Sequence, residues 1–371
     1  MDSLTQIVLG AAVGEAALGK KIGSRAMLWG AIAGTIPDLD VLLRFVTDEI
    51  TATEMHRGFS HSLVFSILAS PALAWVAHRI HQRKRPEATY RNWVWLFFLA
   101  LVTHPLLDMH TTWGTQFFWP FEVKITYNNI FVVDPLYTIP FLICLFIAMA
   151  HKRTNPKRRF YNNLGLIIST TYMALTFVFK GFGYHAVDDS LAKQGIDFVE
   201  IETKPTPFNT ILWDAHVETE EGYRFGHYSL LDDDEPVEFS REYPKNHHLI
   251  DSIRDEKVIQ QLLRIANGWY TIEKEGDRLF FNDLRFGLFG IKIPTKYGGL
   301  GMSQTNYMRI LSTISQHCGS VAATLSAHQS IGVPQPLKLA GTDAQKEKYL
   351  PMFAKGAVSA FGLTEPNVGS D

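Results

Sequence analysis

The side chains best suited to chemistry are histidines and aspartates that stand where apolar stretches end. His104 and Asp108 are four positions apart, so on a helix both side chains share one face. His56 and His61 are five apart with Gly58 between them, which suits a turn leading into a helix rather than one helical face. Neutral imidazoles and carboxylates are ligands of divalent metal ions, so these residues predict metal chemistry.

Further charged groups stand near the same stretch ends. Asp38 and Asp40 close one apolar stretch, and Arg57 lies between two of the histidines. Ionisable groups at the edge of hydrocarbon are costly unless they pair, face water or bind an ion. One divalent ion of unknown identity would satisfy several together, and the predicted ligands are Asp38, His56, His61, His104 and Asp108.

Catalytic roles are predicted for two neighbours of these ligands. Arg57 has the guanidinium group that pairs bidentately with a phosphate or a carboxylate. Asp40 is predicted as a general base, a role that Asp38 could also fill. The alternative is structural, because a lone histidine near a helix end is more often an interfacial or core residue and an aspartate after proline often caps a turn. Three histidines and three carboxylates at one face favour a functional site.

Six apolar stretches must position these residues. The later ones approach or exceed the length that crosses a bilayer, about 17–20 residues, whereas the first two are short and rich in Gly and Ala. For those two a buried helical hairpin is the alternative, and Gly10 and Gly14 have a spacing that suits close helix packing in lipid. The stretches are 4–19, 26–37, 63–78, 93–109, 130–150 and 162–181.

The loops between the stretches predict an orientation. Every alternate loop is basic, as with Lys20, Lys21 and Arg25 between the first two stretches. Basic loops face the cytoplasm by the positive-inside rule. Six crossings then place the N-terminus and residues 182–371 outside the cytoplasm, and they bring all the predicted ligands to the outer face of a multi-pass membrane protein.

The remaining composition sets further bounds. The net charge of −2 over 371 residues gives no reason to expect nucleic acid as a partner, and the two cysteines have no zinc-site spacing. Residues 182–287 lack an apolar span. They hold two paired runs of aromatic and β-branched residues, around Glu221-Gly222 and around Gly276-Asp277. Both read as hairpins and predict a small β-rich domain.

Four motifs in residues 1–287 resemble one family. MDSLTQIVLGAAVGE, IPDLDVL, HRGFSHSL and THPLLDMHTTWGT are similar in order to the motifs of the YdjM-like membrane-bound metal-dependent hydrolases, and FNDLRFG is similar to that family's closing stretch. The resemblance implies the metal site more directly than a reaction. One departure is Gln6, where that family usually has a histidine.

Residues 288–371 resemble a different family. LFGIKIPTKYGGLGM and LTEPNVGSD are similar to segments of acyl-CoA dehydrogenases. The resemblance implies that Leu363 and Thr364 would contact a flavin ring and that Ser370 would lie near an acyl-CoA, if the segment functions. We expect no bound FAD, because the similarity covers too little of a flavin pocket.

These observations predict a mainly α protein. We expect a polytopic membrane domain of about six apolar helices at 1–181, a β-rich extracytoplasmic domain at 182–287, and a helical acyl-CoA dehydrogenase-like segment at 288–371. The predicted function is metal-dependent hydrolysis of a phosphoester or ester at the outer membrane face, with the lipid bilayer and a small-molecule or lipid substrate as partners. The alternatives are an acyl-CoA dehydrogenase-like flavoprotein fragment and a membrane protein that binds metal without catalysis.

Overall fold

The fold is taken from a computed structural model, which describes residues 1–232, 236–276, 278–285, 337 and 341–354. By compactness the chain divides into two units, residues 1–282 and 283–371, and each is described by itself.

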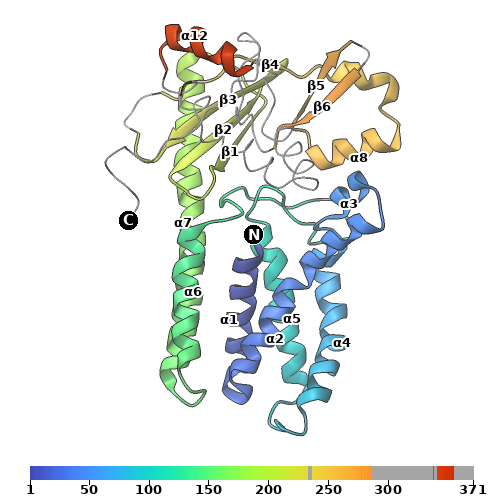
Figure 1. Cartoon of the computed structure of the whole chain (residues 1–371), viewed down its shortest axis with the longest axis vertical. Coiled ribbons are helices and arrows are strands. Elements are labelled where there is room, and N and C mark those ends of the chain that lie inside the picture. The colour runs from blue at the N-terminus through green and yellow to red at the C-terminus, as the bar shows by residue number, and fades with distance from the viewer. Residues whose placement is uncertain (233–235, 277, 286–336, 338–340, 355–371) are drawn as a thin grey trace. The chain divides into compact units, whose positions relative to one another are not determined.

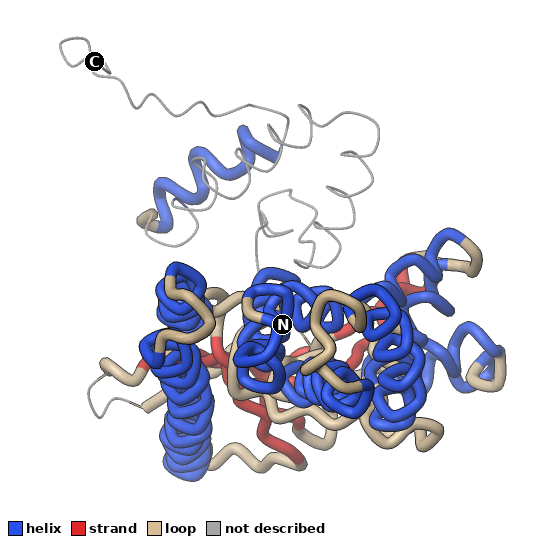
Figure 2. Tube along the Cα trace, turned by 90° about the horizontal axis from the view of Figure 1, so that it is seen from below, coloured by secondary structure: helices blue, strands red, loops and turns tan. Residues whose placement is uncertain are grey.

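The first unit begins with helices that lie side by side (Figure 1), and Figure 2 shows them end-on. Each of the six apolar stretches lies mostly within a helix. Asp2 caps the first helix by accepting from the Thr5 N–H, and Asp134 and Asn155 cap two later ones that begin with proline, as helix N-termini favour. The helices are α1 (Ser3–Ile22), α2 (Ser24–Thr35), the 3₁₀ helix η1 (Pro37–Phe45), α3 (Glu49–Met55), the 3₁₀ helix η2 (Phe59–His61), α4 (Leu63–His81), α5 (Tyr90–Asp108), α6 (Pro135–Ala150) and α7 (Pro156–Gln194).

Helices α1 and α2 cross backbone to backbone through glycines of both helices. Gly10 and Gly14 face Gly30 and Gly34, and a Cβ added at Gly34 would lie 2.6 Å from the Gln6 carbonyl oxygen. Small residues at such crossings let helices approach closely in lipid. This contact fixes where Gln6 and the Gly34 carbonyl lie along their helices. Both groups belong to the polar cluster described below.

We expect Gly30→Val to lower the stability of the helical bundle by at least about 1–3 kcal/mol, the usual cost of overpacking. The new side chain would overlap the Gly10 carbonyl and lie 2.9 Å from Gly14 Cα. Thermal unfolding in detergent measures the effect. The control is Gly181→Val, because a Cβ at that position on α7 meets no atom within 4 Å. Equal melting temperatures for both variants would contradict the prediction.

The prediction of about six apolar membrane helices is not supported. Among the described residues, two helices are long and apolar enough to cross a membrane, α4 and α7; a third span results if α2 and η1, bent by 44° relative to each other, count as one. Helix α6 is apolar but has 16 residues, because Asp134 caps it and the preceding residues form loop. Helix α1 carries Glu15, Lys20 and Lys21, and α2 has only 12 residues.

A mixed α/β part follows in the same unit. Strands β1 (Glu200–Pro205), β2 (Leu212–Glu218), β3 (Gly222–Ser229) and β4 (Tyr243–Pro244) form an antiparallel sheet in that order, and β5 (Tyr270–Glu275) pairs with β6 (Arg278–Asp283). Both predicted hairpins are confirmed. Between them lie the 3₁₀ helix η3 (His247–Ile253) and the amphipathic helix α8 (Lys257–Ala266), which had not been predicted.

The sheet is attached to the last helix of the bundle. The end of α7 buries Val187 and Leu191 against Ala215 and Val217 of β2. One continuous helix therefore belongs to the helical bundle and also packs against the sheet (Figure 1). Helix α8 in turn contacts α3, where Arg264 Nε lies 2.5 Å from Glu54 Oε1.

The second unit is described over a short range only. Its described helix is α12 (Asp343–Ala354). Leu363, Thr364 and Ser370, for which flavin and acyl-CoA contacts were predicted, lie outside the described residues.

Candidate metal centre

Four of the predicted ligands converge from three elements. Asp38 comes from η1, His61 from η2, and His104 and Asp108 from α5, and one ligand atom of each lies within 4.8 Å of all the others. The Nε2 atoms of His61 and His104 are 3.1 Å apart. Asp38 Oδ1 lies 3.3 Å from His61 Nε2 and 3.4 Å from His104 Nε2, and Asp108 Oδ2 lies 3.4 Å and 3.5 Å from the same two atoms.

This spacing fits a metal ion. In a tetrahedral site with bonds of about 2.0–2.2 Å, ligand atoms lie about 3.3–3.6 Å from one another. The five separations given above, 3.1–3.5 Å, are close to that edge length. Asp108 Oδ2 is also buried without a donor in hydrogen-bonding geometry among the described residues. A cation would satisfy this oxygen and both imidazole lone pairs at once.

Hydrogen bonds on the far side of each imidazole ring orient it. His104 Nδ1 lies 2.6 Å from the Gly34 carbonyl oxygen, so it donates there and leaves Nε2 as the acceptor. His61 Nδ1 lies 3.0 Å from Ser60 Oγ and 3.4 Å from Asp40 Oδ2. Metal-binding histidines usually have such partners, which fix the tautomer and the ring direction.

Asp40 is the centre of a separate hydrogen-bond network. Its carboxylate accepts from the backbone N–H of Arg57 at 2.9 Å and from Ser60 Oγ at 3.0 Å, and it lies 2.9 Å from His56 Nδ1. The structure therefore does not group His56 with the four converging side chains, although it had been predicted as a ligand. His56 bonds the carboxylate that stands behind His61.

The carboxylates also affect the protonation of His61. Burial alone would lower its pKa, but hydrogen bonds to Asp108, Asp38 and Asp40 outweigh burial and raise the pKa to about 9. An imidazole must lose its proton before it binds a metal ion. A metal ion bound at this site would therefore have to displace a proton from His61.

Arg57 lies beside the four ligand candidates. Its side chain is buried, with Nε 3.2 Å from Asp108 Oδ2 and Nη1 donating to Thr111 Oγ1 at 2.8 Å. Its backbone has a φ of +58°, which is unusual for a bulky residue and is held by the bond to Asp40. The guanidinium group is thus fixed next to the ligand cluster.

Two groups, one on helix α1 and one just before it, were not in the predicted set of site residues. Gln6 Nε2 donates to Asp108 Oδ1 at 2.9 Å and lies 3.3 Å from the His104 carbonyl oxygen, and the amino group of Met1 contacts Asp108. The position of Gln6 in the first motif was the available signal. Its amide donates a hydrogen bond to the carboxylate of Asp108, and Gln6 is not among the grouped ligand candidates.

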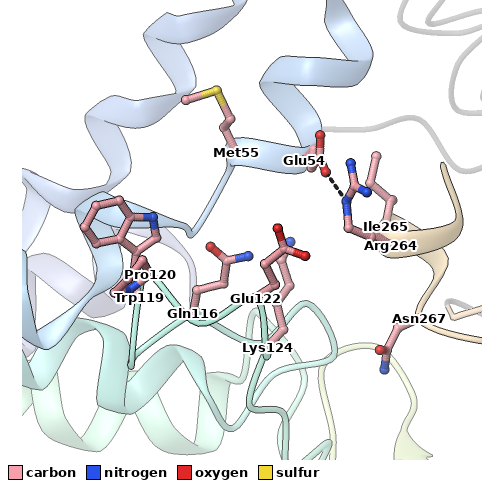
Figure 3. A pocket seen from close by; sticks show the side chains of 10 residues that line it. All are labelled: Glu54, Met55, Gln116, Trp119, Pro120, Glu122, Lys124, Arg264, Ile265 and Asn267. Carbon is pink, nitrogen blue, oxygen red and sulfur yellow. Dashed lines mark hydrogen bonds and ion pairs between the residues drawn. The ribbon is translucent and has the colours of Figure 1, made fainter. Parts of the chain in front are cut away.

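A cleft of about 220 Å³ opens next to the hydrogen-bond network of Asp40, His56 and Arg57 (Figure 3). It lies between α3, the loop at 116–124 and the end of α8, where Glu54 pairs with Arg264. It contains none of the four converging residues. The backbone connects the cleft to the residues beside the ligand candidates. Met55 lines the cleft one residue before His56, and the N–H of Gln116, which also lines it, donates to the Arg57 carbonyl at 3.0 Å.

Comparison with known families divides the chain. Residues 1–183 match the family model described as YdjM inner membrane protein, and residues 250–357 match the acyl-CoA dehydrogenase N-terminal domain. The second match begins before residue 288, where the sequence had suggested a change. No solved structure matches the chain.

Curated relatives match a short part of the chain. A probable acyl-CoA dehydrogenase FadE10 of Mycobacterium tuberculosis is 62% identical over 85 residues, 23% of this chain and 13% of that protein. The mitochondrial very long-chain specific acyl-CoA dehydrogenase of Rattus norvegicus is 52% identical over 86 residues, with the same coverage of each chain. The chain thus spans about 13% of the length of these relatives. It joins a segment similar to YdjM inner membrane proteins to a segment similar to the N-terminal domain of acyl-CoA dehydrogenases.

Proposed function

We propose that this chain is a membrane-bound metal-dependent hydrolase that acts on a phosphoester or an ester. The observation that carries the proposal is the convergence of Asp38, His61, His104 and Asp108, whose ligand atoms all lie within 4.8 Å of one another and whose five carboxylate–imidazole and imidazole–imidazole separations are 3.1–3.5 Å. The match of residues 1–183 to a membrane protein family supports a membrane location.

These four residues would hold the ion, and hydrolysis would need one further coordination position, for water or substrate, beyond these four ligands. Two imidazoles and two carboxylates suit zinc and similar divalent transition metals. Such an ion, when bound, polarises a phosphoryl or acyl oxygen and lowers the pKa of a bound water to about 7. In hydrolysis the water oxygen would join phosphorus or the acyl carbon, the bond from that atom to the leaving oxygen would break, and the leaving alkoxide would take up the proton that the water loses.

The neighbouring residues have distinct proposed roles. Arg57 is fixed beside Asp108, so its guanidinium group can pair with the oxyanion of a phosphoester or ester that reaches the ligands. Asp40 is better suited to positioning than to proton transfer, because its oxygens already accept from the Arg57 backbone and Ser60 and lie near His56 and His61. It holds the loop and the His61 ring.

We also propose a multi-pass orientation with the metal centre at the outer face. The alternating basic loops support it, as does the placement of all four ligand candidates towards one end of the helices. On this arrangement residues 182–371 are extracytoplasmic. The proposed domain limits remain 1–181, 182–287 and 288–371.

We expect Arg57→Ala to reduce hydrolysis of para-nitrophenyl phosphate by about 10²–10³-fold, the usual effect of losing one transition-state donor. The purified full chain is loaded with zinc, and activity and bound zinc are measured in the same samples. Zinc content should stay near that of the wild type, since Arg57 is not among the ligand candidates. Arg254→Ala, at an exposed arginine directly after η3, is the matched control.

Measuring both activity and bound zinc distinguishes a hydrolase from a protein that binds metal without catalysis. Full activity in Arg57→Ala would contradict the role of the guanidinium group. Zinc bound by the wild type without hydrolysis of any phosphoester or carboxylic ester would favour non-catalytic metal binding instead.

A second candidate function rests on the acyl-CoA dehydrogenase similarity, which reaches 62% identity over 85 residues. It would be a flavin-dependent role of the C-terminal segment on an acyl-CoA. The visible absorbance of bound flavin in the purified full chain, after addition of FAD, tests it. Retention of flavin through gel filtration would support this role, and its complete loss would count against it.

A further inference from the structure

The accessible side of the metal centre is formed by η1. The side chains of His61, His104 and Asp108 are fully buried (0% exposed), whereas that of Asp38 is 26% exposed. A substrate can therefore reach the ligand cluster from the side on which Asp38 lies. That side belongs to a short helix at the bend after α2.

The surface around Asp38 is apolar rather than polar. The η1 rim consists of the exposed side chains that alternate with the two aspartates or follow them, and it would be costly in water. Its members are Leu39, Val41, Leu42, Phe45 and Val46. Asp38 and Asp40 face the polar network from the same helix, so the polar site and the apolar surface share one element.

The η1 rim continues into surfaces that suit lipid. Helix η1 packs against η2, and α4, one of the two candidate spans, begins two residues after His61 with exposed Ile67 and Leu68. Exposed Phe118, Trp119 and Phe121 lie in the loop whose Phe117 carbonyl accepts from Leu63 N–H at 2.9 Å, at the start of α4. Tryptophan is enriched at membrane–water interfaces, as Trp119 would be here.

We propose that the η1 rim lies in the outer leaflet of the bilayer and that the substrate is a membrane phospholipid, which approaches Asp38 sideways from the leaflet. This inference rests on the proposed hydrolase function. The acyl chains stay against the rim, while the ester or phosphodiester group reaches Arg57 and the ligand cluster. Helix η1, bent by 44° from α2, carries both Asp38 and the rim, so the exposed side of Asp38 adjoins an apolar surface.

The lipid contact is tested first without reference to activity. In a full chain with Cys144 and Cys318 replaced by Ser, Leu42→Cys is labelled with a nitroxide and reconstituted in phosphatidylethanolamine–phosphatidylglycerol vesicles. Collisions with oxygen, which concentrates in hydrocarbon, are compared with collisions with a water-soluble nickel chelate. Leu68→Cys on α4 is the lipid control, and Val199→Cys before β1 is the aqueous control. The Leu42 label should match Leu68, and a match to Val199 would overturn the proposal.

Substrate approach is tested by a ratio of rates. We expect Leu42→Asp to lower the rate on vesicle phospholipid relative to para-nitrophenyl phosphate by about tenfold, because a charge at this surface repels the leaflet. Val199→Asp should leave the ratio unchanged. An unchanged ratio in Leu42→Asp would overturn lateral approach. If the wild type hydrolyses neither substrate, the hydrolase function fails, and the nitroxide experiment still decides whether the rim contacts lipid.

Discussion

Purified wild-type protein should contain about one equivalent of a transition metal per chain, and the double variant His61→Ala, His104→Ala should contain almost none. The reason is geometric, because the two Nε2 atoms provide half of the converging ligand set and lie 3.1 Å apart. Elemental analysis of detergent-purified samples, before and after reloading with zinc, measures the metal directly. The assay needs no assumption about the substrate.

The matched control replaces two exposed histidines, His185→Ala and His248→Ala, and should keep the wild-type metal content. Equal metal in the wild type and in the His61, His104 double variant would place the ion elsewhere. No metal in any sample after reloading would make the four residues a hydrogen-bonded polar cluster, and the hydrolase proposal would fall with it.

Glu15→Ala should destabilise the helical bundle by about 3–5 kcal/mol, the cost of leaving one charge of a buried pair without its partner. Arg158 Nε and Nη2 donate to the two Glu15 carboxylate oxygens at 2.6 Å and 2.7 Å, and both side chains are buried. The pair joins α1 to α7, and a Cβ at Gly19 would overlap the Glu15 carboxylate. Unfolding in detergent, followed by circular dichroism, measures the change.

The paired variant Glu15→Met, Arg158→Leu should lose much less stability than Glu15→Ala, because it removes both charges. The control is Glu87→Ala, since Glu87 pairs with Arg153 at 3.4 Å on the exposed surface and such pairs contribute about 0–1 kcal/mol. Equal losses in Glu15→Ala and Glu87→Ala would show that burial does not strengthen the pair in the folded chain.

Local patterns predicted the elements well, for reasons that act within a few residues. The apolar stretches became helices, and Pro135 and Pro156 begin two of them because proline fits the first helical turn. Both β-hairpins follow from paired runs around short polar turns. The predicted number of spanning helices is not supported; for α6 the reason is that an apolar stretch does not reveal how much of it a cap such as Asp134 leaves outside the helix.

The sequence by itself determined that ligands of metal type gather at one end of the helices, since the i, i+4 spacing of His104 and Asp108 puts both on one face of α5. Only the tertiary structure decided which of the other predicted residues join the ligand cluster and which lie behind it. Asp38 turns to the ligand cluster while Asp40 turns to His56 and the loop behind it. That division depends on contacts between η1, η2 and α5, which are distant in sequence, and on the close α1–α2 crossing that sets the Gly34 carbonyl against His104.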